Sequence, residues 1–384
     1  MKSAELRTGF QVRWMALLGC AVALPIAALG GAGHSDAVAA QSGSSKSYSS
    51  VPVSAEELAA RRILEAQVKA LGQSFRGDIG IAVQEVDSGW STAYDGNTFF
   101  PQQSVSKFWV ALTALDKADR GELSLFAPVT MHKEDITLFH QPIAAEIGPN
   151  GKTTSVAELM TRALQQSDNT CNDFVLWRAG GPDAVRNFLR SKGISGIRFG
   201  PGERKLQSAI AGIEWKQSYA YNGGFYTARN ALPLSARRAA FENYIANPMD
   251  GATPLGIVDA LARLKRGELL SPASTERLLG IMSHTKTGPQ RLKGGLQPGW
   301  TLSHKTGTGQ VLGSEQAGYN DIGVVTSPDG RSYAMAVMIR RTSAPLQERM
   351  AAMQATVRSV ITFDANRKGY DMARYREPGD RGGR

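Results

Sequence analysis

The first pair of side chains that could do chemistry together lies in the tetrapeptide SVSK, residues 104–107. A serine hydroxyl is a weak nucleophile at neutral pH, because it needs a neighbouring base to take its proton. Positions i and i+3 share one face of a helix, so the Lys107 amine can reach the Ser104 oxygen if this segment is helical. If Ser104 begins that helix, the positive end of the helix dipole also favours an oxyanion formed beside it. The pair alone is not specific, because SHTK at 283–286 has the same spacing.

Two further motifs follow along the chain. The tripeptide SDN at 167–169 offers a hydroxyl for proton relay and an amide that can hold a substrate carbonyl, although Ser and Asp there are also typical of a helix N-cap. Lys-Thr-Gly occurs twice, at 286–288 and at 305–307. The order S-x-x-K, S-D-N, K-T-G is far rarer than any one of the three motifs, and it is typical of serine enzymes that form an acyl intermediate.

Only the second Lys-Thr-Gly is expected to take part in chemistry. Lys305 follows the strand-like residues 300–302, whereas the first copy is followed at once by Pro289, which cannot extend a central strand. We therefore expect Lys286 to lie in a loop and Lys305 to lie on a strand at the edge of the site.

Composition limits the class of protein. The chain has 384 residues, of which 42% are hydrophobic and 20% charged, as is ordinary for a globular protein with a large core. Its net charge of +10 comes from basic residues scattered over the chain without a nucleic-acid motif, so nucleic acid is not expected as a partner. The five histidines have no ligand spacing, so no metal and no cofactor is expected. Cys171, the only cysteine after the apolar N-terminal segment, is expected to be buried.

Residues 1–39 have the pattern of a signal peptide. Basic residues precede an apolar stretch at 14–31, and the small residues AVA at 37–39 suit a cleavage site. Pro25 and the glycine-rich end make the stretch a poor membrane-spanning helix, while Cys20 leaves lipoprotein processing as an alternative. We expect a periplasmic or secreted protein without a stable membrane span, and a monomer.

The pattern of the remaining chain predicts an α+β fold, in which elements from both ends build one sheet and a helical lobe is inserted between them. The predicted segments are a Ser-rich linker at 40–54, a first helix that begins at the capping box Ser54–Glu57, a hairpin from Ile79 to Tyr94, a mostly helical region at 108–280, strands at 300–308, 321–326 and 332–340, a final helix at 346–361, and a disordered basic tail at 366–384.

On these three motifs the chain resembles the class A serine β-lactamases over residues 55–365. It is most similar to their extended-spectrum branch, which shares Gln103 before the nucleophile, TGPQRLKG at 287–294 and His304 before the lysine. The resemblance implies an α/β sandwich with an all-helical lobe and an antiparallel sheet, the fold shared with DD-peptidases. It also implies hydrolysis of penicillins and cephalosporins through a covalent acyl-enzyme, without a cofactor.

The resemblance assigns roles to individual side chains. Ser104 would attack the lactam carbonyl, with Lys107, or Glu203 through a water, taking its proton, and Ser167 would pass a proton to the leaving nitrogen. The backbone N–H groups of Ser104 and Thr308 would form the oxyanion hole. The residues expected to bind substrate are Asn169, Arg291, Lys305, Thr306, Gly307 and Thr308.

Three departures from the family pattern lie in or directly after the loop that carries Glu203. Glu203 stands at the position of the family's deacylating base, with a surface carboxylate as the alternative, but Gln207 replaces the asparagine that helps hold the hydrolytic water. Pro201 stands where many members have a clamping arginine, although Asp250 matches its acidic partner. An insertion at about 214–248 is rich in aromatic residues, which either pack, or form a wall against substrate or a contact with another protein.

A further departure lies on the strand after K-T-G, where Ser314 occupies the other arginine position used in the family. The resemblance of TGPQRLKG implies that Arg291 is the arginine that supports Lys305 and the substrate carboxylate, with a lone surface arginine as the alternative. Two other functions remain open. The same motifs occur in penicillin-binding DD-peptidases, which deacylate slowly, and a protein that binds β-lactams without turning them over would serve as a sensor.

Overall fold

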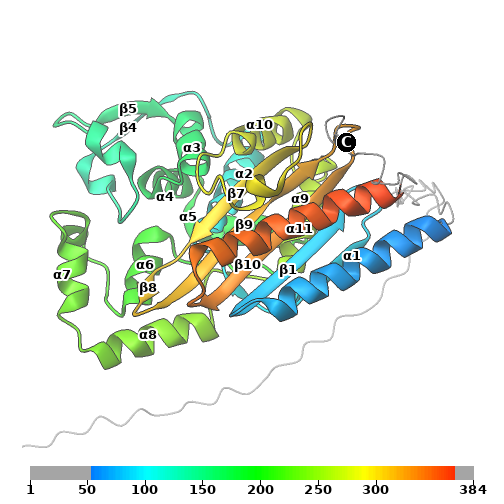
Figure 1. Cartoon of the computed structure of the whole chain (residues 1–384). Coiled ribbons are helices and arrows are strands. Elements are labelled where there is room, and N and C mark those ends of the chain that lie inside the picture. The colour runs from blue at the N-terminus through cyan, green and yellow to red at the C-terminus, as the bar shows by residue number, and fades with distance from the viewer. Residues whose placement is uncertain (1–52, 368–384) are drawn as a thin grey trace, which may run out of the picture. The chain divides into compact units, whose positions relative to one another are not determined.

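The chain's central sheet is built from its two ends, as the sequence pattern predicts (Figure 1). The computed structural model describes residues 53–367; the predicted signal peptide, all but the end of the linker, and the tail after residue 367 lie outside the described residues. The strands of the sheet are β1 (Asp78–Glu85), β2 (Ser91–Tyr94), β7 (Thr301–Thr308), β8 (Val311–Leu312), β9 (Glu315–Thr326) and β10 (Ser332–Thr342). They pair antiparallel in the order β2-β1-β10-β9-β7, with β8 on β9, which confirms the α+β class.

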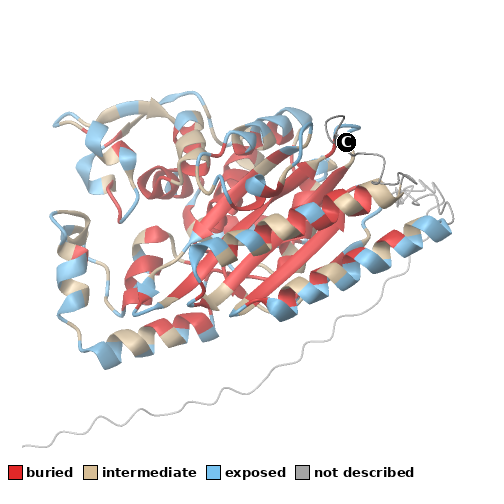
Figure 2. Cartoon of the chain, in the orientation of Figure 1, coloured by how far each residue is buried: buried red, intermediate tan, exposed pale blue. Residues whose placement is uncertain are grey.

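Alternation along β10 divides the interior into two cores. Tyr333, Met335 and Val337 belong to the core under α1 and α11, whereas Ala334 and Ala336 face the helical lobe. This follows from the period of two in a strand, which sends successive side chains to opposite faces of the sheet. Both faces are therefore buried, as Figure 2 shows for the central strands.

Helices α1 (Ala55–Ser74) and α11 (Leu346–Arg367) lie side by side across one face of the sheet (Figure 1). Ser54 caps α1 by accepting a 3.2 Å hydrogen bond from the N–H of Glu57, which is one half of the predicted capping box, while the Glu57 carboxylate pairs with Arg61. The last helix continues to Arg367, beyond the predicted end at residue 361. Arg367 stays in the helix because its guanidinium pairs with Glu85 on β1 and packs over Phe363.

The other face carries the helical lobe. Its helices are α2 (Lys107–Asp119), α3 (Val156–Gln165), α4 (Asn169–Arg178), α5 (Gly181–Ser191), α6 (Glu203–Ala211), α9 (Pro254–Lys265) and α10 (Pro272–Ser283). Helix α2 is central, since Phe108, Trp109 and Leu112 are fully buried in the core that joins lobe and sheet. Short two-stranded pairs, β3 (Phe100–Pro101) with β6 (Gly251–Ala252) and β4 (Pro128–Met131) with β5 (Lys152–Ser155), were not expected in this region. No helix among residues 53–367 is long and apolar enough to cross a membrane.

The predicted insertion folds into helices α7 (Gly224–Asn230) and α8 (Leu234–Ala246), which follow α6 (Figure 1). Two small cores hold it. Phe241 and Tyr244 of α8 pack against Leu206 of α6, and Phe225 of α7 packs against Leu138 of the lobe. Most of the inserted aromatic residues are therefore packed in these cores, which agrees with the expectation that they serve packing.

Candidate active site

Ser104 and Lys107 lie in hydrogen-bonding contact. Ser104 belongs to a short 3-10 helix, η1 (Gln103–Ser106), that runs directly into α2, so the i and i+3 positions share a face. The Lys107 Nζ donates to Ser104 Oγ at 2.7 Å and to Asn169 Oδ1 at 2.8 Å, and it also pairs with Glu203. The lysine is 1% exposed, so its amine is confined to these partners.

Glu203 is a buried residue of the site and not a surface carboxylate. It begins α6, where its backbone N–H donates to Asp173 Oδ1 at 2.9 Å, and it is 3% exposed. One of its oxygens accepts from Lys107 and the other from Gln207 Nε2 at 3.2 Å. A carboxylate held between an ammonium and an amide is placed to take a proton from the nucleophile's side of the site.

Strand β7 brings the third motif to the same place. Lys305 Nζ donates to Ser167 Oγ at 3.0 Å and to the carbonyl of Thr306 at 2.9 Å. Burial, together with the nearby cations of Lys107 and Arg291, holds the pKa of the Lys305 ammonium well below its usual range. This amine can therefore release its proton more readily than an exposed lysine, and its hydrogen-bond partner for that exchange is the Ser167 hydroxyl.

The SDN tripeptide does both things that its sequence allowed. Asp168 is the N-cap of α4 and accepts from the N–H of Cys171 at 2.9 Å and of Ile143 at 2.8 Å. Its neighbours Ser167 and Asn169 face the site, and Asn169 Nδ2 donates to the carbonyl of Leu138 at 2.9 Å. One turn thus anchors a helix and presents two polar side chains.

Gly307 permits the close approach of β7 to the segment before the nucleophile. A Cβ at this position would lie 2.3 Å from the carbonyl oxygen of Gln102, which is closer than any real contact. The glycine of Lys-Thr-Gly therefore sets the distance between the strand and η1.

Arg291 is buried and not a lone surface residue. Its guanidinium donates to the carbonyls of Gly307 at 2.9 Å and Asn320 at 2.7 Å, and to Thr308 Oγ1 at 2.6 Å. These bonds fix the end of β7 and place a positive charge at one end of the cavity. Ser314, at the other arginine position of the family, is exposed in the turn after β8.

The first Lys-Thr-Gly lies in a loop, as expected, after α10. The backbone N–H of Lys286 bonds to the carbonyl of Gln165 at 2.9 Å, and its neighbour Thr287 shares a 2.6 Å hydrogen bond with the hydroxyl of Thr306. Thr287 lines the cavity. The Lys-Thr-Gly in the loop therefore supports the Lys-Thr-Gly on β7 through this hydrogen bond, which the sequence did not predict.

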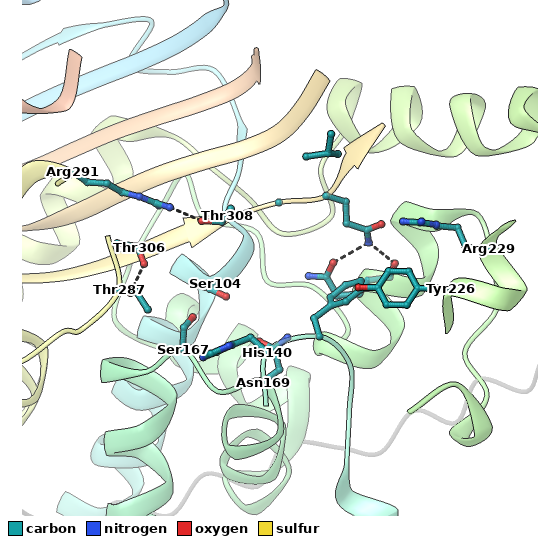
Figure 3. Close-up of a pocket in the computed structure, with 15 residues that line it drawn as sticks. Ser104, His140, Ser167, Asn169, Tyr226, Arg229, Thr287, Arg291, Thr306 and Thr308 are labelled. Carbon is teal, nitrogen blue, oxygen red and sulfur yellow. Dashed lines mark hydrogen bonds between the residues drawn. The ribbon is translucent and has the colours of Figure 1, made fainter. Parts of the chain in front are cut away.

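These side chains surround a cavity of about 480 Å³ (Figure 3). Of the residues predicted from sequence, those that line it are Ser104, Ser167, Asn169, Arg291, Thr306 and Thr308. Lining residues that sequence reasoning missed are Phe139, His140, Gln310 and Val311, together with Arg229 from α7; Tyr226, also from α7, is one of the inserted aromatic residues for which a wall was the alternative expectation. The insertion therefore also forms a wall of the cavity. The sequence signal that could have indicated this is the i, i+3 spacing of Tyr226 and Arg229, which places an aromatic ring and a cation on one face of a helix.

A chain of side chains connects the insertion to the nucleophile. Tyr244 donates to Asp250 Oδ2 at 3.2 Å, and it accepts from Gln103 Nε2 at 2.5 Å. Gln103 in turn accepts from Gln207 Nε2 at 3.1 Å, and Gln310 donates to Gln207 Oε1 at 3.0 Å. Asp250, the acidic partner of the family's clamp, therefore accepts at Oδ2 from a tyrosine of the insertion and from the Gln103 N–H, in a chain that has proline at the arginine position, while its Oδ1 has no hydrogen-bond partner among the described residues.

Two buried carboxyl groups in this region have raised pKa values. Burial raises the pKa of Asp250 to about 6, against the hydrogen bonds from the N–H of Gln103 and from Tyr244. Burial, with the charge of Glu203 adding to it, also raises the pKa of Asp173 to about 6. Burial and Asp250 raise the pKa of Tyr244, so its hydroxyl keeps its proton.

Three non-glycine residues around the cavity have positive φ. They are Gln103 at 53°, Phe139 at 62° and Ser167 at 63°, a conformation that costs about 1–3 kcal/mol for such residues. Gln103 precedes the nucleophile, and Phe139 and Ser167 line the cavity, so the backbone strain is located at the residues that shape the site.

No group of three or more His, Cys, Asp and Glu side chains among residues 53–367 could hold a metal ion. Cys171 is buried at the start of α4, and burial raises the pKa of its thiol.

Comparison with known proteins agrees with this geometry. Residues 62–362 match the family described as "Beta-lactamase enzyme family". The chain is 28% identical to Beta-lactamase VEB-1 of Pseudomonas aeruginosa over 262 residues, 68% of this chain and 77% of that protein. It is 25% identical to Extended-spectrum beta-lactamase PER-1 of the same organism, over 83% of this chain and 91% of that protein.

Solved structures give the same result. A β-lactamase from Chitinophaga pinensis superimposes with a TM-score of 0.65 at 27% identity, covering 79% of this chain and 98% of that one. The TLA-3 extended-spectrum β-lactamase superimposes with a TM-score of 0.65 at 25% identity, covering 78% and 98%.

Proposed function

Because this chain belongs to the β-lactamase enzyme family, we propose that it hydrolyses β-lactam antibiotics through a covalent acyl-enzyme on Ser104. The observation that carries the proposal is the contact of one buried amine with both a serine and a carboxylate. Lys107 Nζ lies 2.7 Å from Ser104 Oγ and pairs with Glu203. The serine proton therefore has a short route to an acceptor.

Acylation begins with attack of Ser104 Oγ on the lactam carbonyl carbon. The proton of the serine passes either to Lys107, after that ammonium has given a proton to Glu203, or to Glu203 through a water; in both cases it ends on the carboxylate in net terms. The carbonyl oxygen becomes an oxyanion, which the backbone N–H groups of Ser104 and Thr308 would stabilise.

Collapse of that intermediate breaks the lactam C–N bond. The leaving nitrogen takes a proton from the Ser167 hydroxyl, which Lys305 replenishes across its 3.0 Å hydrogen bond. Before deacylation, the proton held on Glu203 returns through solvent to Lys305, which has given one away, so both groups regain their charges. Glu203 then removes a proton from a water that attacks the ester carbonyl, and it passes that proton to the Ser104 oxygen as the ester C–O bond breaks. The Gln207 amide, 3.2 Å from the Glu203 carboxylate, is placed to hold that water.

Substrate would be oriented by its ring carboxylate. Arg291 and the hydroxyls of Thr306 and Thr308 line one end of the cavity, and the buried Lys305 amine lies behind them, bonded to Ser167 and to the Thr306 carbonyl. The Asn169 amide would meet the acylamide side chain. Penicillins and cephalosporins share both groups, and both are included in the proposal.

The location follows from the sequence alone. We propose export across the inner membrane under the signal at 1–39, to the periplasm or the medium, where a β-lactamase meets its substrates. A monomeric enzyme is part of the same proposal, and gel filtration of the protein beginning near residue 40 tests it.

Turnover of a penicillin and a cephalosporin tests the function. Many turnovers per enzyme are expected, together with a penicilloyl adduct detectable by intact mass that is absent in Ser104→Ala. A burst of one product molecule per enzyme without further turnover would indicate a DD-peptidase-like protein. This is the second candidate function, because Gln207 alters the loop that supports deacylation. Absence of any Ser104-dependent adduct would leave only non-covalent sensing.

A further inference from the structure

The insertion places a cation on the side of the cavity opposite to Arg291. Arg229 and Tyr226 come from α7, and both line the cavity. Figure 3 shows Arg291 and Thr308 on one side of Ser104 and Arg229 on the other, with the Arg229 side chain pointing toward the cavity. The ring carboxylate of a β-lactam is expected near Arg291, so Arg229 lies on the side of the acyl substituent.

Helix α7 is held in place at the cavity. Phe225 is 2% exposed and packs with Leu138 and Ala211, and its ring meets that of Phe139 edge-on at a centroid distance of 4.9 Å. Phe139 itself lines the cavity. The aromatic contact therefore ties the insertion to the lobe directly beside the opening, so that Arg229 has a defined location.

The Arg229 charge has no acidic partner among residues 53–367. Its guanidinium contacts the side-chain oxygen of Asn230 at 3.3 Å and lies 5.1 Å from the centre of the Tyr226 ring. No Asp or Glu occurs among the described residues that line the cavity. A half-buried guanidinium without a carboxylate is a strong binding group for an anion, because its N–H donors match a carboxylate in pairs.

We propose that Arg229 is a specificity-determining residue that binds a carboxylate on the acyl side chain, so that β-lactams with two carboxylates are preferred. The inference rests on the proposed function and names the substrate class for the same site. One carboxylate would lie at Arg291 and Lys305, and the second at Arg229, with the scissile bond at Ser104 between them. The Tyr226 ring beneath the guanidinium limits its movement.

Benzylpenicillin and carbenicillin provide the test, because they differ only by a carboxylate on the acyl side chain. The Arg229→Gln change is expected to lower kcat/KM for carbenicillin about fivefold and to leave that for benzylpenicillin within about twofold, as for one partly exposed ion pair. The loss should be in KM, since the interaction is the same in the bound substrate and the transition state. Arg229→Lys should keep part of the preference, and added salt should shrink it.

Lys216→Gln is the matched control, since Lys216 is an exposed cation of the same insertion that does not line the cavity. It should change neither rate. Equal losses for both drugs in Arg229→Gln would overturn the inference and leave the proposed function intact. If the wild type turns over neither drug, the same comparison is made on the rate of adduct formation at Ser104, where equal slowing again overturns the inference. If neither drug reacts at all, both proposals fall.

Discussion

The two walls of the cavity are held by different forces. The wall formed by β7 is fixed by the backbone ladder to β9 and by Arg291, whose three hydrogen bonds go to that strand, its threonine and the neighbouring strand. The wall formed by α6 and α7, with α8 packed behind α6, depends on side chains, whose hydrogen bonds run from Gln310 through Gln207 and Gln103 to Tyr244 and Asp250. The first wall should tolerate changes in pH and in single side chains better than the second, because backbone bonds do not titrate.

The most damaging change is expected in the second wall. Glu203→Gln should slow deacylation about 10²–10⁴-fold, since it removes the base that activates water, and the acyl-enzyme should accumulate. Stopped-flow kinetics with a chromogenic cephalosporin and intact mass measure both effects. An unchanged steady-state rate would show that a different carboxylate serves deacylation.

The stability that Asp250 gives to the second wall should depend on pH. Its carboxyl binds a proton more tightly in the folded protein, with a pKa of about 6, than in the unfolded chain, where the ordinary value is 3.8. Its contribution to stability is therefore greatest below pH 4 and is lost as the pH rises through about 6. The amide of Asn does not titrate, so the Asp250→Asn variant should lack this pH-dependent contribution to the free energy of unfolding.

Urea unfolding of the wild type and of Asp250→Asn at several pH values measures this directly. The free energy of unfolding of the wild type, relative to that of the variant, should fall by at most about 3 kcal/mol between pH 4 and pH 7. A difference that rises over the same range would show that the Asp250 carboxylate is stabilised by its partners more than burial opposes it.

In the first wall the critical contact is steric. Gly307→Ala would force a Cβ against the Gln102 carbonyl, and should lower the free energy of unfolding by about 2 kcal/mol and reduce acylation. Gly280→Ala is the control, because nothing lies within 4 Å of a Cβ on that helical residue, and it should stabilise slightly. Equal and small effects of the two changes on unfolding and acylation would mean that β7 can shift away from η1.

Tyr244→Phe tests whether the insertion supports the nucleophile's neighbours. The variant leaves Gln103 Nε2 without its buried partner and removes one of the two donors to Asp250 Oδ2, which should cost about 1–2 kcal/mol and slow deacylation through Gln207. Tyr226→Phe removes a half-exposed hydroxyl on the cavity side and should not change stability. A silent Tyr244→Phe would mean that the second wall is held by its apolar cores alone.

Local geometry explains what the sequence could predict. The Ser104–Lys107 pair and the Asp168 cap depend on neighbours within a few residues, and the strand of Lys305 was distinguished from the loop of Lys286 by one proline. The contact of Tyr244 with Asp250 could not be predicted, because it depends on how the turn after α8 folds Asp250 back against the end of that helix. The β4–β5 pair was missed because its short, mostly polar strands resemble a loop.

Cys171 lies two residues beyond Asn169, at the start of the helix that the SDN turn caps, and it is fully buried. After removal of the signal peptide, it would be the only thiol in the mature enzyme. Alkylating reagents can reach it only when the first turn of α4 opens. The rate of alkylation would therefore measure how often the segment that carries Ser167 and Asn169 opens locally, without an engineered cysteine.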